Sequence, residues 1–371
     1  MPKAVKAISS RILALDLMRG WFLIAILLDH LQYFPNGLDI LTGRGQLYVS
    51  AAEGFFLISG IVLGIVRGRK LLDKPFRVAA TLLLKRGVQL YITAVLLFFI
   101  FTFMGWLFID NPGIKPGIRP IDQNFWEIIH GAFTLNYIYG WADYLRLYAV
   151  FLIASPLVIW LLRKKLWYVA LVGSVYVWML FDSSTLETDE LSQIFSWQLI
   201  FFGGMILGYY LEPIRAWWRS LPLLLKRTIV VSSLGITAIT ALANYLFIVH
   251  GDLVFSQQSI LSIKETLEPY LSKERLPIPR ILLFLVWFTA GFWLFRRFED
   301  WIVQQLGWLL LPLGTHSLYV YTIQAFVIYI AHLFVPQATA FWPLNLVLSL
   351  ACLGVVIVAV RYKFLMKIIP N

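Results

Sequence analysis

The sequence predicts an all-α integral membrane protein, a single bundle of about ten transmembrane helices. Hydrophobic residues make up 60% of the 371 residues, charged residues make up 14%, and the mean hydropathy is +0.78. Soluble domains do not have this composition. Apolar runs cover almost the whole chain, so we expect one membrane domain over residues 1–371. The third observation is the distribution of Lys and Arg between the loops, which predicts the topology.

The ten expected spans are apolar runs of roughly 20 residues, the length that crosses a bilayer as a helix. Charged residues, Pro and Gly mark the loops between them. The basic N-terminal stretch has no clear small-residue cleavage site, so we expect the segment after it to remain as the first span. In chain order, the expected spans are 12–34, 47–66, 83–109, 143–162, 166–181, 195–212, 228–249, 280–297, 309–333 and 344–362.

Lys and Arg residues are concentrated in alternate loops. If the N-terminus is cytoplasmic, 22 of the 31 lie in inside segments and 7 in outside loops. This positive-inside pattern predicts that both termini are cytoplasmic and that the two long loops, about 110–142 and 250–280, are outside. It accounts for the net charge of +11, so we expect the lipid bilayer and no nucleic acid as a partner. The one cysteine, Cys352, excludes a disulfide framework and a thiolate metal site, and we expect no metal.

The first span carries four ionisable residues, Asp16, Arg19, Asp29 and His30. An Asp or Arg at membrane depth costs at least about 2.5–3.5 kcal/mol, so such groups usually face a bundle interior or a wet cavity. Arg19 and His30 are 11 residues apart, which places them on one helix face and roughly 16 Å apart along the axis. A helix that only anchors a protein in the membrane does not need a buried cation and a titratable base, Arg19 and His30, on one face.

The expected topology brings polar residues from several spans to the outer level of His30. Glu53 lies about six residues from the outer end of the second span, and Asp143 begins the fourth. Carboxylates around a histidine orient the ring and strengthen it as a general base. We therefore expect Asp29, Glu53 and Asp143 to assist His30 in catalysis. The side chains expected to bind an acceptor at this level are Trp141, Trp197 and Gln198.

A second group of polar residues lies at the inner level of Arg19. Lys85 and Arg86 open the third span, and His316 and Ser317 lie about seven residues into the ninth. The cations would suit the phosphates of an anionic substrate that enters from the cytoplasm. We therefore expect all five residues to bind the donor.

Structural alternatives exist for most of these residues. Arg19 could pair with Asp16 one turn away, and His30 could be a hydrated helix end. Lys85 and Arg86 could be ordinary positive flanks of a span. Glu53 is harder to explain in this way, because GFFLISG follows it and offers no local cation.

Several motifs, in their order along the chain, resemble one family. The pattern LDLMRG followed by LLDH has an Arg-x10-His spacing, and EGFFLISG follows in the next span. This opening resembles the acyltransferase-3 superfamily of membrane O-acyltransferases. The later stretches KRGVQLY, DYLRLYAVFLIASPL, FSWQLIFFGG and LGTHSLYVY are similar to its OpgC branch, the succinyltransferases of periplasmic glucans.

The resemblance implies a ten-helix bundle that takes an acyl group from cytoplasmic acyl-CoA and delivers it to a sugar hydroxyl of a glucan outside. It implies an inner (plasma) membrane location, and acyl-CoA as a co-substrate with no permanently bound cofactor. It places Arg19 and His30 on the essential Arg-x10-His pair, Ser59 with Glu53 on the second-span motif, and Arg86 on the third-span basic motif. We also expect Ser59 to bind the substrate. One departure is Gln324, where many relatives have a histidine.

A second function is compatible with the same residues. A polytopic transporter or flippase could use His30 and the nearby carboxylates as a proton relay. The two functions differ in one measurable property, because an acyltransferase turns over acyl-CoA and a transporter moves solute without thioester turnover. The sequence favours the acyltransferase, with direct transfer to the acceptor, since no Ser-x-His or Cys nucleophile is positioned for a covalent intermediate.

Overall fold

The computed structural model describes residues 12–114, 119–137, 139–182, 189–253, 255–366 and 369. Throughout these ranges the regular structure is helical, and they contain no strand. The protein is an all-α membrane protein, as the sequence predicts. The end segments 1–11 and 370–371, which we expect in the cytoplasm, lie outside the described residues.

Each expected span except 309–333 coincides with one helix or with a helix and a short extension. Short helical turns extend or connect the longer helices: η1 (Gly43–Gly45), η2 (Gly64–Arg69), η3 (Gly140–Ala142), η4 (Tyr245–Val249) and η5 (Gly251–Leu253). The α-helices are α1 (Leu13–Leu31), α2 (Asp39–Thr42), α3 (Ala51–Leu63), α4 (Phe76–Leu107), α5 (Phe125–Phe133), α6 (Asp143–Arg163), α7 (Trp167–Asp182), α8 (Asp189–Tyr209), α9 (Leu211–Ser220), α10 (Leu223–Asn244), α11 (Gln257–Leu271), α12 (Ile278–Arg297), α13 (Glu299–Thr315), α14 (Ser317–Phe334) and α15 (Trp342–Arg361).

Within the described part of the chain, 7 helical segments are long and apolar enough to cross a membrane. They are α3 with η2, α4, α6, α10 with η4, α12, α14 and α15. The pair α8 and α9, which is bent by 74°, forms an eighth if it is counted as one span. Helix α1 has sufficient length, but it carries three charged residues, Asp16, Arg19 and Asp29. The total of ten spans stays a prediction.

The expected span 309–333 is divided between two helices. Helix α13 ends at Thr315 and α14 begins at Ser317, because the backbone of His316 leaves helical geometry (φ −111°, ψ 37°). Pro312, four residues earlier, lies inside α13 and cannot donate a backbone hydrogen bond. The break brings Thr315 and Ser317 to the level of Arg19, where the inner site lies.

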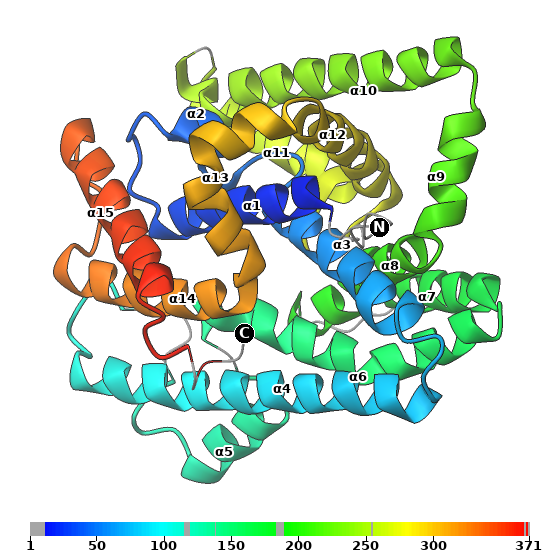
Figure 1. The fold of residues 1–371 in the computed structure, drawn as a ribbon. Coiled ribbons are helices and arrows are strands. Elements are labelled where there is room, and N and C mark those ends of the chain that lie inside the picture. Colours follow the sequence, from blue (N-terminus) through cyan, green and yellow to red (C-terminus); the bar gives the residue numbers. More distant parts are fainter. Residues whose placement is uncertain are drawn as a thin grey trace, which may run out of the picture.

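Helix α1 lies in the middle of the molecule. It contacts α3, α12, α13 and α14, and Figure 1 shows α10 and α12 on one side of it and α4 and α6 on the other. Its closest approach is to α13, where two glycines let the backbones meet. A Cβ at Gly20 would collide with the Leu310 carbonyl, and one at Gly314 would collide with the Asp16 carbonyl. Small residues at close helix contacts are typical of membrane bundles.

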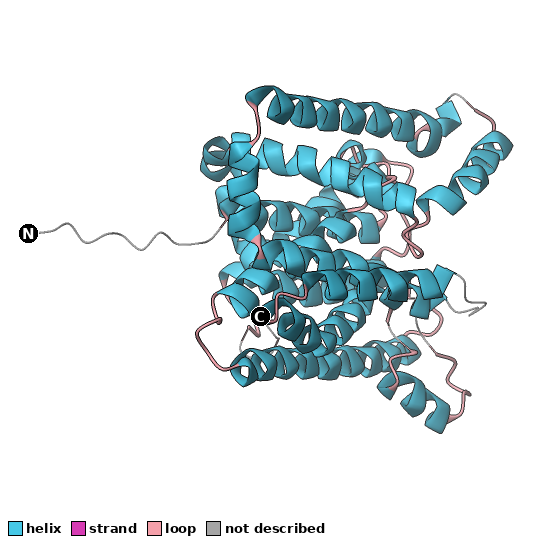
Figure 2. Ribbon diagram, turned by 90° about the vertical axis from the view of Figure 1, so that its right-hand side faces the viewer, coloured by secondary structure: helices cyan, strands magenta, loops and turns pink. Residues whose placement is uncertain are grey.

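A second helix pair, α3 and α8, forms the aromatic part of the core. The fully buried Phe56 ring packs edge-on against Trp197, Phe201 and Phe151, with centroid distances of 5.3, 6.4 and 5.7 Å. Figure 2 shows most of the long helices running in roughly the same direction. The two long loops also contain helices, since α5 lies in the first and packs on α4, and α11 lies in the second.

We expect Gly314→Ala to destabilise the protein by about 1–3 kcal/mol, because the added methyl group has no space between α13 and α1. The matched control is Gly354→Ala on α15, where a Cβ meets no atom within 4 Å. Detergent-induced unfolding of both variants measures the difference. Equal stability of the two variants would show that the α1–α13 contact is looser than the structure indicates.

Candidate functional site

The outer part of the site is built on a buried ion pair between Glu53 of α3 and Arg280 of α12. Arg280 donates from Nε to Glu53 Oε1 at 2.7 Å, and its Nη2 lies 2.5 Å from the same oxygen. The other carboxylate oxygen, Oε2, accepts from the Ser50 amide at 2.9 Å and from the Ser50 hydroxyl. Both charged side chains are buried, with 4% and 0% of the Arg280 and Glu53 side chains exposed. The carboxylate therefore also caps the N-terminus of α3.

This pairing differs from the sequence interpretation of Glu53, which found no cation nearby in the chain. The cation is Arg280 in the first turn of α12, 227 positions later in the chain, and the sequence interpretation had counted it only for topology. Arg280 also donates from Nη1 to the Leu271 carbonyl at 2.6 Å. One signal in the sequence could have identified it, because an Arg at the outer end of an apolar span is contrary to the positive-inside rule.

Lys273, in the loop between α11 and α12, is the second residue at the candidate site that the sequence interpretation missed. Its side chain makes a hydrogen bond with Tyr144. Interaction with Tyr144, and then with Glu53 and Asp143, raises the pKa of Lys273 above its ordinary value, although burial acts in the opposite direction. The ammonium group therefore stays charged at neutral pH. Its positive charge interacts electrostatically with all four residues that are expected to serve catalysis: Asp29, His30, Glu53 and Asp143.

Asp143 is held at the start of α6 by hydrogen bonds to one of its oxygens. Tyr321 of α14 donates its hydroxyl to Asp143 Oδ1 at 2.9 Å, and the Tyr144 amide donates to the same atom at 2.7 Å. Trp141, expected to bind the acceptor, stacks on the His332 ring at 5.0 Å. His332 stacks in turn on Tyr33, and its side chain makes hydrogen bonds with the backbone at the end of α1.

Trp197 and Gln198 use their polar atoms in contacts within the protein. Trp197 is 1% exposed and donates from Nε1 to the Lys273 carbonyl at 3.0 Å, so it holds the loop that carries Lys273. Gln198 Nε2 donates to the Ser174 carbonyl at 2.7 Å, and the Ser174 hydroxyl donates to Gln198 Oε1. These contacts join α8 to the loop and to α7. The acceptor-binding role of both residues stays a prediction.

A cavity of about 330 Å³ lies beside this cluster. It is bounded by the segment from Gly45 to Ser50, by α11 and by the loop that follows α11. Its charged and polar lining includes Gln46, Ser50, Lys264, Glu268, Lys273 and Arg280. His30 is in the last turn of α1 and is partly exposed. His30 does not line this cavity. Lys273 does line it, and its positive charge interacts electrostatically with His30.

The inner part of the site is a cavity of about 430 Å³ with four basic residues in its lining. Arg19 lies at this cavity, donates from Nη2 to the Ser317 hydroxyl, and holds its guanidinium 5.5 Å from the Phe55 ring centroid. The structure therefore brings Arg19, Lys85, Arg86 and Ser317 together, as expected, while His316 lies at the adjacent helix break. Arg67 of η2 is the fourth basic residue, and it had been counted only as an inside flank.

The two parts of the site lie at opposite ends of α1, which is continuous from Leu13 to Leu31. At a rise of 1.5 Å per residue, Arg19 and His30 are roughly 16 Å apart along it. Between them, Gln324 of α14 donates from Nε2 to the Leu23 carbonyl at 2.9 Å. Gln324 Oε1 and the hydroxyl of Ser59 are both buried and have no hydrogen-bond partner among the described residues.

We expect Glu53→Gln or Arg280→Met alone to cost about 3–5 kcal/mol of stability, because each leaves a buried charge unpaired. The double variant should lose clearly less than the sum of the two. The control is Arg296→Met, which removes a solvent-exposed Arg296–Glu299 pair at 2.7 Å and should cost less than about 1 kcal/mol. Unfolding midpoints in mixed micelles measure all four variants, and simple additivity would contradict a direct pair.

Comparison with known proteins assigns the chain to a family. The family model described as OpgC protein matches residues 11–368, which include both parts of the site and all the helices that form them. Searches of curated proteins and of solved structures returned no match. A family match over nearly the whole chain agrees with the motif order in the sequence, and the chain belongs to the OpgC family.

Proposed function

We propose that the protein is a transmembrane O-acyltransferase of the acyltransferase-3 type. It moves a succinyl or acetyl group from cytoplasmic acyl-CoA to a hydroxyl group of an extracytoplasmic glucan or related glycan, in the cell inner membrane. The observation that carries this proposal is the pair of polar sites on α1, a cationic cavity at Arg19 and a carboxylate–histidine–lysine cluster at His30. Membership in the OpgC family supports it.

The inner cavity suits the phosphate groups of coenzyme A. Four basic residues, Arg19, Arg67, Lys85 and Arg86, line it, and guanidinium groups bind phosphate oxygens through two parallel hydrogen bonds. The acyl-pantetheine arm then has to extend along α1 toward His30. The unpartnered Ser59 hydroxyl and Gln324 Oε1 are suitable partners for the polar groups of this arm on its way through the bundle.

The outer cluster suits the transfer step. His30 takes the proton of the acceptor hydroxyl as its oxygen attacks the thioester carbon. A carbon–oxygen bond forms, the carbon–sulfur bond breaks, and the proton leaves with the coenzyme A thiol. Lys273 keeps a positive charge close to His30, where it stabilises the negative charge that develops on the carbonyl oxygen. Asp29 and Asp143 flank the same position.

A transporter or flippase is the competing function, and the carboxylates around His30 and Lys273 would form its proton relay. The cationic inner cavity favours the acyltransferase, because a relay needs no phosphate site. Thioester turnover by purified protein decides between them. Mass spectrometry of cell-surface glycans, with and without the protein, identifies the acyl group and the acceptor through the missing acetyl or succinyl mass.

We expect His30→Ala to abolish transfer while acyl-CoA binding survives, because the base acts only in the chemical step. A general base contributes about 10²–10⁴ in rate. The control is His250→Ala, since His250 follows η4 and its ring faces Tyr245 at 6.2 Å. Transfer rate and donor affinity are measured on protein that elutes as a single species. A folded His30→Ala protein with the normal rate would move the transporter function ahead.

We expect Arg19→Ala to weaken acyl-CoA binding by about 10–100-fold, the effect of losing a charged hydrogen bond. Arg19→Lys should restore part of the affinity, because Lys keeps the charge but lacks the planar fork. Arg215→Ala on α9 is the control, because Arg215 pairs with exposed Glu212 at 2.9 Å. Calorimetric titration with acyl-CoA measures all three variants, and unchanged affinity in Arg19→Ala would remove Arg19 from the donor site.

A further inference from the structure

The cavity of about 330 Å³ beside the outer cluster has one wall on α11, in the loop 250–280 that the sequence predicts to be outside. Lys264, Glu268 and Leu271 of α11 line it, and their spacing of three or four residues places them on one face of the helix. The segment 45–50 forms another wall, and Lys264 Nζ donates from α11 to Gln46 Oε1 of this segment at 3.0 Å. We call this cavity the α11 cavity.

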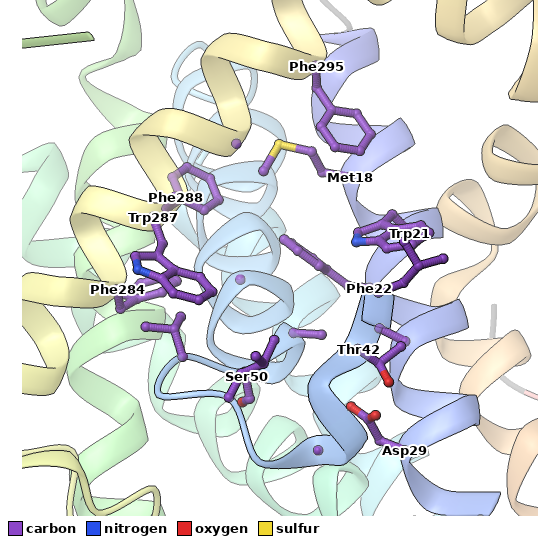
Figure 3. A pocket seen from close by; sticks show the side chains of 18 residues that line it. Met18, Trp21, Phe22, Asp29, Thr42, Ser50, Phe284, Trp287, Phe288 and Phe295 are labelled. Atoms are coloured by element: carbon purple, nitrogen blue, oxygen red, sulfur yellow. The ribbon is translucent and has the colours of Figure 1, made fainter. Parts of the chain in front are cut away.

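The α11 cavity adjoins the residues proposed for the transfer step. Lys273 lines it from the loop that follows α11. Gly45 lines it as well and contacts Asp29, since a Cβ at Gly45 would lie 3.4 Å from Asp29 Cβ. Asp29 makes hydrogen bonds with the Thr42 side chain and the Gly45 backbone, and Figure 3 shows Asp29 and Thr42 facing each other. A single residue, Gly45, therefore connects the lining of the cavity to Asp29, which precedes His30.

Positive and negative charges nearly balance at the α11 cavity. The charged side chains of its lining are three cations and two carboxylates: Lys264, Lys273, Arg280, Glu268 and Glu274. Behind this lining, Arg280 pairs with Glu53, and Lys273 interacts with Glu53 and Asp143. The inner cavity differs, because four basic residues line it and its described lining contains no carboxylate. The inner cavity therefore suits an anion, whereas the α11 cavity suits an uncharged ligand.

The lining of the α11 cavity offers several kinds of hydrogen-bonding group. Ammonium groups donate, carboxylates accept, and the amide of Gln46 does both, so together they match hydroxyl groups, which also donate and accept. Gln46, Lys264 and Glu268 are exposed, so the cavity is open to solvent there and can admit part of a longer molecule. Its volume of about 330 Å³ is near the lower limit of small-molecule sites, about 300–1,000 Å³. A short stretch of a polyhydroxylated chain has the matching size and chemistry.

We propose that the α11 cavity binds a short, uncharged segment of the glycan acceptor, whose hydroxyl groups form hydrogen bonds with Gln46, Lys264 and Glu268. This inference rests on the proposed function for the identity of the ligand, and it places the acceptor beside Lys273. The polar atoms of Trp197 and Gln198 are used in contacts within the protein, so other side chains have to supply most of the hydrogen bonds to the acceptor.

Cysteine protection tests the binding without the reaction. Leu267→Cys, which lies in the cavity lining, is introduced into the full chain together with Cys352→Ser, and its labelling by a charged maleimide is followed in lipid nanodiscs. The probes are glycans washed from the surface of cells that lack the protein, separated by anion exchange into neutral and anionic fractions. We expect the neutral fraction to slow the labelling, and to do so more than the anionic fraction. Leu261→Cys is the matched control, because Leu261 is exposed on the same helix outside the cavity lining, and its labelling rate should not change.

Kinetics test the residues that bind the acceptor. Radiolabelled succinyl-CoA and acetyl-CoA serve as donors, and the neutral glycan fraction serves as the acceptor. Glu268→Gln and Lys264→Met should each raise the half-saturating glycan concentration about tenfold, the effect of losing one hydrogen bond to a charged group, while the affinity for the donor stays the same. Glu265→Gln, on α11 but outside the cavity lining, should equal the wild type.

The outcomes separate this inference from the proposed function. Equal labelling of Leu267→Cys with and without the neutral fraction, or stronger protection by the anionic fraction, would overturn the α11 cavity as the acceptor site. Label transfer by the wild type, with wild-type half-saturating concentrations in Glu268→Gln and Lys264→Met, would also overturn it and leave the proposed function intact. No transfer by the wild type from either donor would contradict the proposed function, and the protection of Leu267→Cys would still decide whether the cavity binds glycan.

Discussion

The absence of water from the hydrocarbon region is the constraint on which this structure depends. A polar side chain on α1 has to find its partner on a neighbouring helix, because bulk lipid offers none. Arg19 finds Ser317, which is 298 positions away in the chain. The backbone carbonyl of Asp16 lies against Gly314, close to the same helix break. The Arg19–Ser317 hydrogen bond therefore ties α14 to α1 next to the close contact between α1 and α13, and Arg19, Thr315 and Ser317 line the inner cavity.

At the His30 end of α1, the Glu53–Arg280 pair likewise determines how helices pack. It fixes the start of α12 against the start of α3, and so it positions the loop between α11 and α12. That loop is held by its backbone carbonyls, which accept from Trp197 and Trp178, and Arg280 donates to the carbonyl at the end of α11, just before the loop. A loop fixed in this way can hold the charged Lys273 near the carboxylates without the disorder usual for an exposed segment. The ion pair thus contributes more to positioning than to stability, since burying two charges is itself costly.

The sequence was sufficient for the features that depend on helix period and composition. It predicted the all-α membrane fold, the common face of Arg19 and His30, and the meeting of Arg19, Arg86 and Ser317 at one level. It missed Arg67, Lys273 and Arg280 as members of the site. These three lie in loops or at span ends, where a positive charge is expected for topology alone, and periodicity says nothing about which loop folds inward.

Gln198 shows that the depth of a residue along a span does not determine its contacts. Depth along a span predicts the outer level for Gln198, but depth does not determine the direction in which a side chain points. Its amide joins α7 and α8. Ser59 and Gln324 differ from it, because each has a buried polar atom without a partner among the described residues. A buried polar atom of this kind calls for a hydrogen-bond partner, which position in the membrane alone does not reveal.

The geometry of α1 also bears on how a donor in the cytoplasm can react with an acceptor outside. The helix has no break between Leu13 and Leu31, so the distance from Arg19 to His30 is set by its rise and stays constant. A fixed distance of roughly 16 Å has to be covered by the substrate itself, and a long flexible arm meets that requirement without a movement of the bundle. In the proposed acyl transfer, the cations around Arg19 hold the charged end of the donor, which cannot enter the hydrocarbon region. In that proposal only the reactive end reaches the outer cluster, where the positive charge of Lys273 interacts with His30.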